Sequence, residues 1–125
     1  MAVHLALLEL GVPYRLELVD FKRKDQRSEA YLRLNPQGQV PTLVIDGKPY
    51  TESAALLMML ADRHPEALLA PSTGAPERNA WYQWQLYQSN VLGANFRCWF
   101  YPPDLGIEEL SPDVRAALQQ RIEGA

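Results

Sequence analysis

The sequence predicts an α/β domain followed by part of an all-α domain. Over residues 1–69, helical and extended periodicities alternate in the order α-β-α-β-β-α. Residues 70–77 are rich in proline, glycine and serine, a composition typical of a linker. Residues 78–125 are aromatic and amide-rich with helical spacing. A chain of 125 residues is long enough to bury one modest core.

The first half of the predicted α/β domain contains two helices and a strand. Residues 2–10 have helical spacing, and the Gly11 and Pro13 that follow are helix stop signals. Residues 14–19 alternate apolar and polar side chains, which predicts a strand. Residues 28–34 are predicted to form a short helix. Its expected buried residues are Tyr31, Leu32 and Leu34.

A β-hairpin and a helix are predicted next. The β-prone runs 42–45 and 48–51 flank Asp46-Gly47, and an Asp-Gly pair in such a place is a strong signal for a two-residue hairpin turn. The following helix is predicted at residues 54–63, with Ser53 as its N-cap. Beyond the linker, one long aromatic helix ends at the two prolines 102 and 103. A last helix, predicted at residues 114–122, follows Ser-Pro-Asp.

The Val40-Pro41 dipeptide lies just before the first strand of the hairpin. Because proline cannot donate to a sheet ladder, Pro41 is expected at the beginning of the strand. We expect the Val40-Pro41 bond to be cis. A cis bond would turn the backbone of Val40 outward and leave its N–H and carbonyl groups available to a ligand.

These motifs resemble the glutathione transferase family. The marks of that family are a Val-Pro dipeptide with a cis proline, a short hairpin, and a Glu/Gln-Ser pair before the next helix. Here they are Val40-Pro41, Asp46-Gly47 and Glu52-Ser53. The similarity extends to residues 8–14 and 60–62, covers most of the first seventy residues well, and is looser in the remainder.

The resemblance implies a thioredoxin-like fold, whose order is β-α-β-α-β-β-α. We therefore expect an N-terminally truncated thioredoxin-like glutathione-binding domain at residues 1–69, a linker at 70–77, and the beginning of a helical C-terminal domain at 78–125. Three explanations for the missing first strand stay open. The chain is a fragment, its start is placed too late, or the protein is genuinely shortened.

The resemblance also implies a glutathione site formed by Gln39, Val40, Pro41, Glu52 and Ser53. In the family the Val backbone pairs with the cysteinyl part of glutathione, and the preceding polar side chain meets the glycyl carboxylate. The γ-glutamyl end of glutathione carries an ammonium and a carboxylate group. An acid beside a helix N-terminus is matched to both charges. The structural alternative is that Ser53 only caps a helix and Glu52 is only a loop acid.

The catalytic residue is left unassigned by the sequence. Family members activate the glutathione thiol with a Ser, Tyr or Cys at or just after the end of the first strand, and no position here matches it. We therefore expect the 125-residue chain alone to be weakly active or inactive. The first function class is an enzyme that conjugates or exchanges the thiol with a small electrophilic or hydrophobic co-substrate. The alternative is a non-catalytic interaction or dimerisation module.

Composition excludes several other classes. The net charge of −3 and the pI near 5.3 argue against nucleic acid as a partner. A single cysteine, Cys98, fits a reducing compartment, so a cytoplasmic location is expected. No apolar run is long enough to predict a membrane span. Two histidines and one cysteine without ligand spacing predict no metal site. We expect no cofactor besides glutathione as co-substrate, and a homodimer by resemblance.

Overall fold

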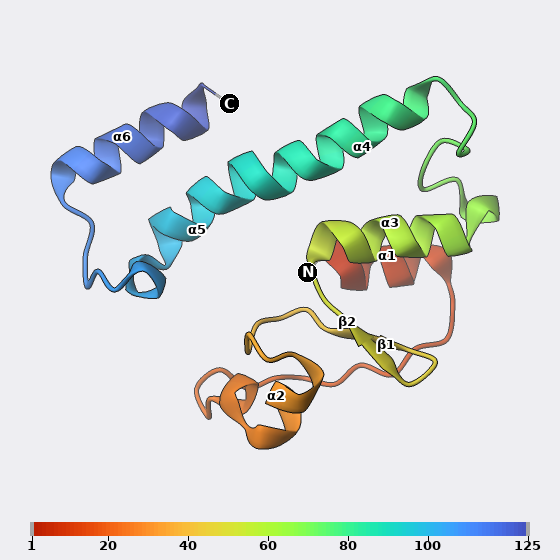
Figure 1. Ribbon diagram of the computed structural model, residues 1–125, viewed down its shortest axis with the longest axis horizontal. Coiled ribbons are helices and arrows are strands. Elements are labelled where there is room, and N and C mark those ends of the chain that lie inside the picture. The colour runs from red at the N-terminus through yellow and green to blue at the C-terminus, as the bar shows by residue number, and fades with distance from the viewer. Residues whose placement is uncertain (1, 125) are drawn as a thin grey trace. The chain divides into compact units, whose positions relative to one another are not determined.

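A computed structural model describes residues 2–124 of the protein. The chain divides into two compact units, Met1–Ser72 and Thr73–Ala125 (Figure 1). The helices and strands of the first unit are α1 (Ala2–Leu10), α2 (Glu29–Leu34), β1 (Leu43–Ile45), β2 (Lys48–Tyr50) and α3 (Ser53–Arg63). Those of the second unit are α4 (Glu77–Tyr87), a π-helical segment (Gln88–Gly93), α5 (Ala94–Phe100) and α6 (Pro112–Glu123).

The predicted hairpin is present. Strands β1 and β2 are antiparallel, with Leu43 opposite Tyr50 and Ile45 opposite Lys48. Asp46 and Gly47 have φ angles of 53° and 74°, and positive φ at both central residues is the signature of a type I′ turn. The turn is tied to the end of α3 by an ion pair in which Arg63 Nη2 lies 3.2 Å from Asp46 Oδ2.

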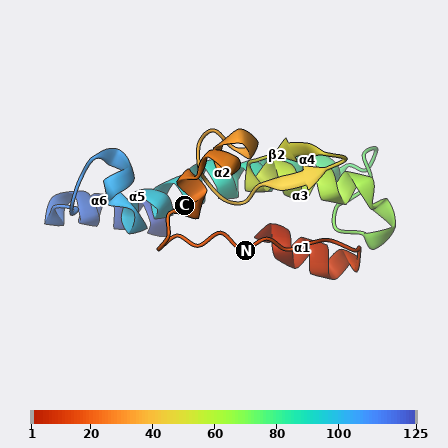
Figure 2. The same cartoon turned by 90° about the horizontal axis from the view of Figure 1, so that it is seen from below.

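The core of the first unit lies between α1 and α3, which are side by side in Figures 1 and 2. Val3 and Leu7 from α1 meet Leu56 and Leu60 from α3, and all four are buried. Leu56 is completely inaccessible to solvent and is the largest fully buried side chain among the described residues. The half-buried residues packed against this cluster are Ala6, Leu10, Val12, Leu43, Tyr50 and Met59.

The predicted strand at residues 14–19 and the predicted burial in α2 are wrong. Residues 14–19 do not form a strand: no backbone hydrogen bond joins them to another segment of residues 2–124. A strand requires a ladder partner, so alternation of side chains alone is insufficient. Tyr14, Leu16 and Leu18 of this segment are exposed, Leu18 to 85%, whereas Val19 is half-buried. None of the three residues expected to be buried in the six-residue helix α2 is fully buried: Tyr31 and Leu32 are half-buried, and Leu34 is 41% exposed.

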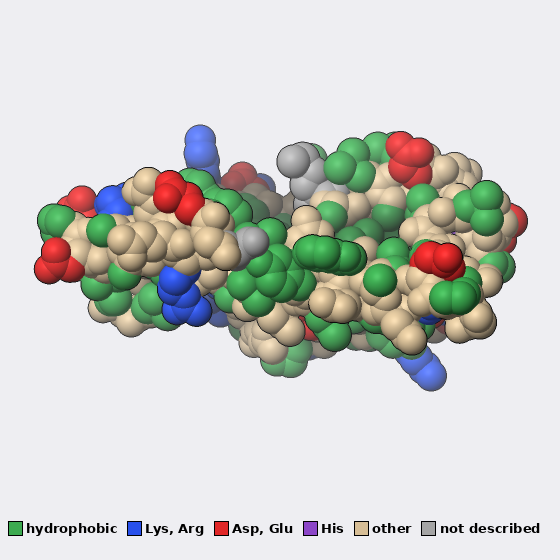
Figure 3. All heavy atoms as spheres, turned by 90° about the horizontal axis from the view of Figure 1, so that it is seen from above, with side chains coloured by type: hydrophobic (Ala, Val, Ile, Leu, Met, Phe, Trp, Pro, Cys, Tyr) green, Lys and Arg blue, Asp and Glu red, His purple; other side chains and the backbone are tan. Residues whose placement is uncertain are grey.

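The second unit is helical. α4 runs through the π-helical segment into α5, and α6 begins where the Ser111 hydroxyl accepts a hydrogen bond from the Val114 N–H at 3.3 Å. α5 and α6 are also joined by the Arg115 guanidinium, which lies 5.2 Å from the centre of the Trp99 ring. Large apolar side chains are exposed on both units, and Figure 3 shows hydrophobic side chains on one such face. In residues 2–124, every helix is too short or too polar to cross a bilayer.

Candidate functional site

The loop that precedes β1 is organised by Asn35, a polar residue only 3% exposed. Its Nδ2 group donates to the Gln39 carbonyl at 2.7 Å, and its Oδ1 atom accepts from the Gln37 N–H at 3.1 Å. Its own carbonyl accepts from the Gly38 N–H at 2.9 Å. A buried amide with its donor and acceptor both used fixes the path of residues 35–39.

A second anchor of the loop is Tyr31 in α2. Its hydroxyl group donates to the Gln39 carbonyl at 2.7 Å and lies 2.9 Å from Thr42 Oγ1. Tyr31 therefore contacts the chain on both sides of Val40 and Pro41. Neither Asn35 nor Tyr31 was predicted to support the site, although Tyr31 was expected to be buried in its helix. The signal for the first was the turn-forming Asn35-Pro36-Gln37-Gly38 run, whereas no sequence pattern indicated that Tyr31 would reach the loop.

Gly38 lies where the loop approaches the segment before α2. Its φ of 63° is in the left-handed region, and a Cβ atom there would lie 2.8 Å from both the Gln26 carbonyl oxygen and Arg27 Nη1. Arg27 Nη1 also donates to the Gln37 carbonyl at 3.2 Å. The close approach of the two backbones therefore requires glycine at this position.

Val40 and Pro41 follow these anchors, and the peptide bond between them is cis. The Val40 side chain is 43% exposed, and Gln39 is also exposed. Within residues 2–124, no hydrogen bond engages the N–H or the carbonyl of Val40. Both backbone groups of Val40 therefore remain available for an incoming polar molecule.

Glu52 and Ser53 lie at the start of α3, and both side chains are exposed. The expectation that Ser53 is the N-cap is wrong. Glu52 occupies the cap position with φ of 68°, its carbonyl accepts from the Leu56 N–H at 2.9 Å, and Ser53 is already the first helical residue. The positive φ at Glu52 turns the chain into the helix one residue earlier than the side-chain types indicated. The N–H groups of the first helical turn have no partner within the helix.

The hairpin register brings the two pairs of residues to the same end of the sheet. Because Leu43 lies opposite Tyr50, the loop that enters β1 and the segment that leaves β2 meet there, as Figure 1 shows. The site therefore combines a backbone N–H and carbonyl at Val40, a carboxylate at Glu52, and a helix N-terminus with a hydroxyl at Ser53. Such a set suits an extended peptide that ends in a zwitterion.

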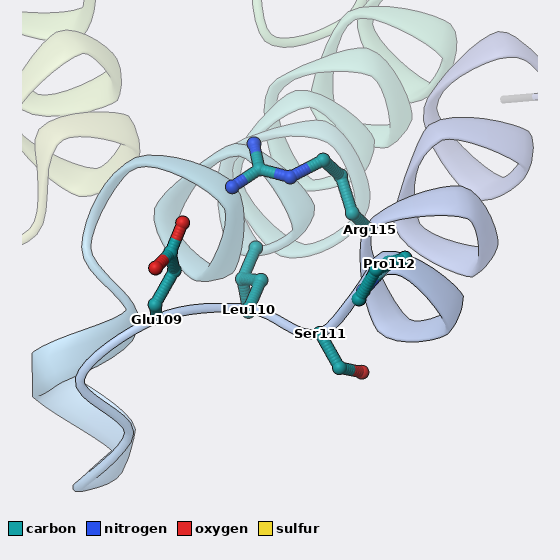
Figure 4. Close-up of a pocket in the computed structure, with 5 residues that line it drawn as sticks. All are labelled: Glu109, Leu110, Ser111, Pro112 and Arg115. Atoms are coloured by element: carbon teal, nitrogen blue, oxygen red, sulfur yellow. The ribbon is translucent and has the colours of Figure 1, made fainter.

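The remaining hollow and the histidine of α1 lie outside the predicted glutathione site. A shallow hollow in the second unit is lined by Glu109, Leu110, Ser111, Pro112 and Arg115 and contains none of the predicted site residues. In Figure 4 the Ser111 hydroxyl points away from the Arg115 and Glu109 side chains. His4 is hydrogen bonded to the Tyr14 hydroxyl at 2.7 Å. Across residues 2–124, no three His, Cys, Asp or Glu side chains gather as metal ligands would.

Comparison with known proteins identifies the family. Residues 1–63 match the family model described as "Glutathione S-transferase, N-terminal domain". The chain is 33% identical to glutathione S-transferase GstA of Escherichia coli O157:H7 over 125 residues, covering 98% of this chain and 61% of that protein. It is 40% identical to maleylacetoacetate isomerase of Rhizobium meliloti over 70 residues, covering 56% of this chain and 33% of that protein.

Solved structures agree with the sequence relatives. A sphingomonad glutathione S-transferase complexed with glutathione has a TM-score of 0.81 and 28% identity, covering 98% of this chain and 59% of that one. The bacterial glutathione transferase BphK, solved as a ternary complex, has a TM-score of 0.79 and 31% identity, covering 98% and 60%. The chain belongs to the glutathione S-transferase family and spans 61% of the length of its E. coli relative.

Family membership confirms the predicted fold class. The first unit is the thioredoxin-like domain of the family with a small sheet, and the second unit is helical.

Proposed function

We propose that the chain binds glutathione at the end of the hairpin where Val40 and Glu52 meet. The observation that carries this proposal is the pairing of an exposed carboxylate with the start of an 11-residue helix, beside Val40, whose backbone N–H and carbonyl have no hydrogen-bond partner in residues 2–124. Glutathione is a short peptide with little apolar surface, so its affinity must come from directed hydrogen bonds and charge pairs.

Each part of glutathione has a matching group in this proposal. The γ-glutamyl carboxylate accepts from the first N–H groups of α3 and from the Ser53 hydroxyl, and the γ-glutamyl ammonium pairs with Glu52. The cysteinyl backbone pairs with the N–H and carbonyl of Val40 in the manner of an added strand. Gln39 meets the glycyl carboxylate, and Pro41 lies in the loop just before β1. The sphingomonad relative complexed with glutathione supports this choice of ligand.

Substitutions at the start of α3 test the γ-glutamyl contacts. We expect Ser53→Ala to weaken glutathione binding by about 1–2 kcal/mol through loss of one charge-assisted hydrogen bond. Because Ser53 is the first helical residue and not the cap, and its side chain makes no hydrogen bond within residues 2–124, the stability of α3 should change little. Glu52→Gln, which keeps the shape and removes the charge, should weaken binding at low salt and less at high salt.

Calorimetric titration measures both variants. Ser72→Ala and Glu66→Gln are matched controls, because both residues are exposed and lie outside the site. Affinities that stay at the wild-type value in both Ser53→Ala and Glu52→Gln would remove these residues from the site.

The proposal for catalysis is separate from the proposal for glutathione binding. We propose that the protein conjugates or exchanges the glutathione thiol with a small electrophile, and that the binding residues found in the 125-residue chain give little activity by themselves. A thiol pKa near 8.5 must be lowered for rapid attack at neutral pH. The five candidate residues hold the tripeptide, and binding without thiolate stabilisation gives little rate. A conjugation assay with a generic aromatic electrophile should give turnover close to the uncatalysed rate. Fast turnover would show that another residue activates the thiol.

The alternative role as a dimerisation module is supported by the apolar side chains exposed on α4 and α5. Trp84 is 63% exposed and Phe100 is 64% exposed. We propose a cytoplasmic homodimer. Met59 packs against the core cluster, so the half-buried Met58 of α3 is the further candidate for its interface. Sedimentation at micromolar concentration should therefore detect self-association, and a monomer at every concentration would exclude it for this chain. A substitution at this interface that abolishes dimerisation and leaves the glutathione affinity unchanged would show that dimerisation and glutathione binding are separate roles.

A further inference from the structure

Tyr31 has a contact pattern that goes beyond holding a loop. Its hydroxyl has one proton, and that proton is donated to the Gln39 carbonyl, 2.7 Å away. The 2.9 Å contact with Thr42 Oγ1 must therefore be one in which the threonine hydroxyl donates to Tyr31. The two hydroxyls form a short relay that ends on Gln39 and spans the Val40-Pro41 dipeptide.

The Gln39 carbonyl oxygen is saturated by this arrangement. It accepts from Tyr31 at 2.7 Å and from Asn35 Nδ2 at 2.7 Å, which together occupy its two lone pairs. Both donors come from α2 or the residue just after it. The oxygen is consequently held toward α2 and is not available to a ligand.

A fixed carbonyl determines where the next N–H points. The Gln39–Val40 peptide is not among the cis bonds, and in a planar trans peptide the carbonyl and the following N–H point in opposite directions. Because the Gln39 oxygen is held toward Tyr31 and Asn35, the Val40 N–H must point away from them. Val40 is 43% exposed, and its N–H makes no hydrogen bond within residues 2–124.

We propose that Tyr31 is a positioning residue that orients the Val40 N–H for hydrogen bonding to the bound peptide. This inference rests on the proposed function. In it Tyr31 does not contact glutathione itself but sets the direction of the Val40 N–H, which does. A peptide plane with one donor instead of two can rotate about its flanking bonds. Binding must then restore its orientation, which costs affinity.

The test compares tyrosine hydroxyls inside and outside the site. Tyr31→Phe removes the relay and keeps the ring, whereas Tyr14→Phe removes an equally short hydrogen bond, to His4 at 2.7 Å, away from the loop. We expect glutathione affinity to fall about tenfold in Tyr31→Phe and to stay within about twofold in Tyr14→Phe. Thr42→Val, which removes the hydroxyl that donates to Tyr31, should weaken glutathione binding. Thr42→Ser, which keeps the hydroxyl, should bind glutathione with wild-type affinity.

A ligand-free measurement separates this inference from the proposed function. The ¹⁵N order parameter of Val40 should fall in Tyr31→Phe and stay unchanged in Tyr14→Phe. Should Tyr31→Phe fail to fold, Thr42→Val is measured in its place. An unchanged order parameter together with wild-type glutathione affinity would overturn the role of Tyr31 and leave the glutathione site standing. Absence of glutathione binding by the wild-type chain would instead overturn the proposed function, while the order parameter would still decide whether Tyr31 orients Val40.

Discussion

Leu56→Ala should destabilise the first unit more than any other single truncation that we consider. Leu56 is completely inaccessible and joins α1 to α3 through Val3, Leu7 and Leu60. Truncating a buried leucine costs the transfer free energy of the lost atoms and leaves a cavity, about 2–5 kcal/mol in total. A whole domain has a free energy of unfolding of only about 5–15 kcal/mol, so this loss is expected to populate unfolded forms of the first unit.

The measurement must report on the first unit alone. All three tryptophans lie at positions 81–99, in the second unit, so their fluorescence is unsuitable. Hydrogen exchange of the α3 amides during urea titration follows the correct region. Leu68→Ala is the matched control, since Leu68 is 84% exposed and should change the free energy of unfolding little. Equal protection of α3 in Leu56→Ala and Leu68→Ala would show that the α1–α3 contact is not the core.

Gly38→Ala should distort the loop that presents Val40 and lower glutathione affinity as well as stability. Two costs add at this position. A non-glycine residue in the left-handed region costs about 1–2 kcal/mol. The new Cβ would also lie 2.8 Å from the Gln26 carbonyl oxygen, and a backbone atom cannot swing aside as a side-chain end can. Relief of such overlap by backbone shifts costs about 1–3 kcal/mol more.

Gly11→Ala separates the two costs. Gly11 has nearly the same φ, 62°, but a Cβ there meets nothing within 4 Å. In a denaturation experiment, the free energy of unfolding of Gly11→Ala should fall only by the cost of placing alanine in the left-handed region. In a glutathione titration, Gly11→Ala should bind with wild-type affinity. If Gly38→Ala matches Gly11→Ala in both measurements, the close approach of residues 26 and 38 has no role in the site.

Local signals in the sequence were sufficient for most of the fold. The hairpin was predictable because Asp46-Gly47 specifies its own turn, and α1 was predictable because Gly11 ends it. Residues 14–19 were not, because strand formation depends on a partner elsewhere in the chain and side-chain alternation carries no information about that partner.

The candidate site was predictable in its exposed residues and not in its supporting ones. Glu52 and Ser53 were found through their chemical match to a zwitterion, yet the cap was misplaced by one residue because the type of residue at 52 gives no indication of its positive φ. The hydrogen bonds from Tyr31 and Asn35 to the Gln39 carbonyl span eight and four residues, and they form only once the loop has folded back onto α2. Side-chain type alone did not reveal them.

Calorimetric titration of the wild-type chain with glutathione, set beside a titration with the dipeptide Cys-Gly, tests the proposed site most directly. Cys-Gly retains the groups that would pair with Val40 and Gln39 but lacks the γ-glutamyl zwitterion that would meet Glu52 and Ser53. We predict saturable binding of one glutathione per chain and binding of Cys-Gly at least about tenfold weaker, since each lost charge-assisted contact contributes about 1.5–3 kcal/mol. No binding of glutathione, or equal affinity for the two peptides, would contradict a γ-glutamyl site at the start of α3.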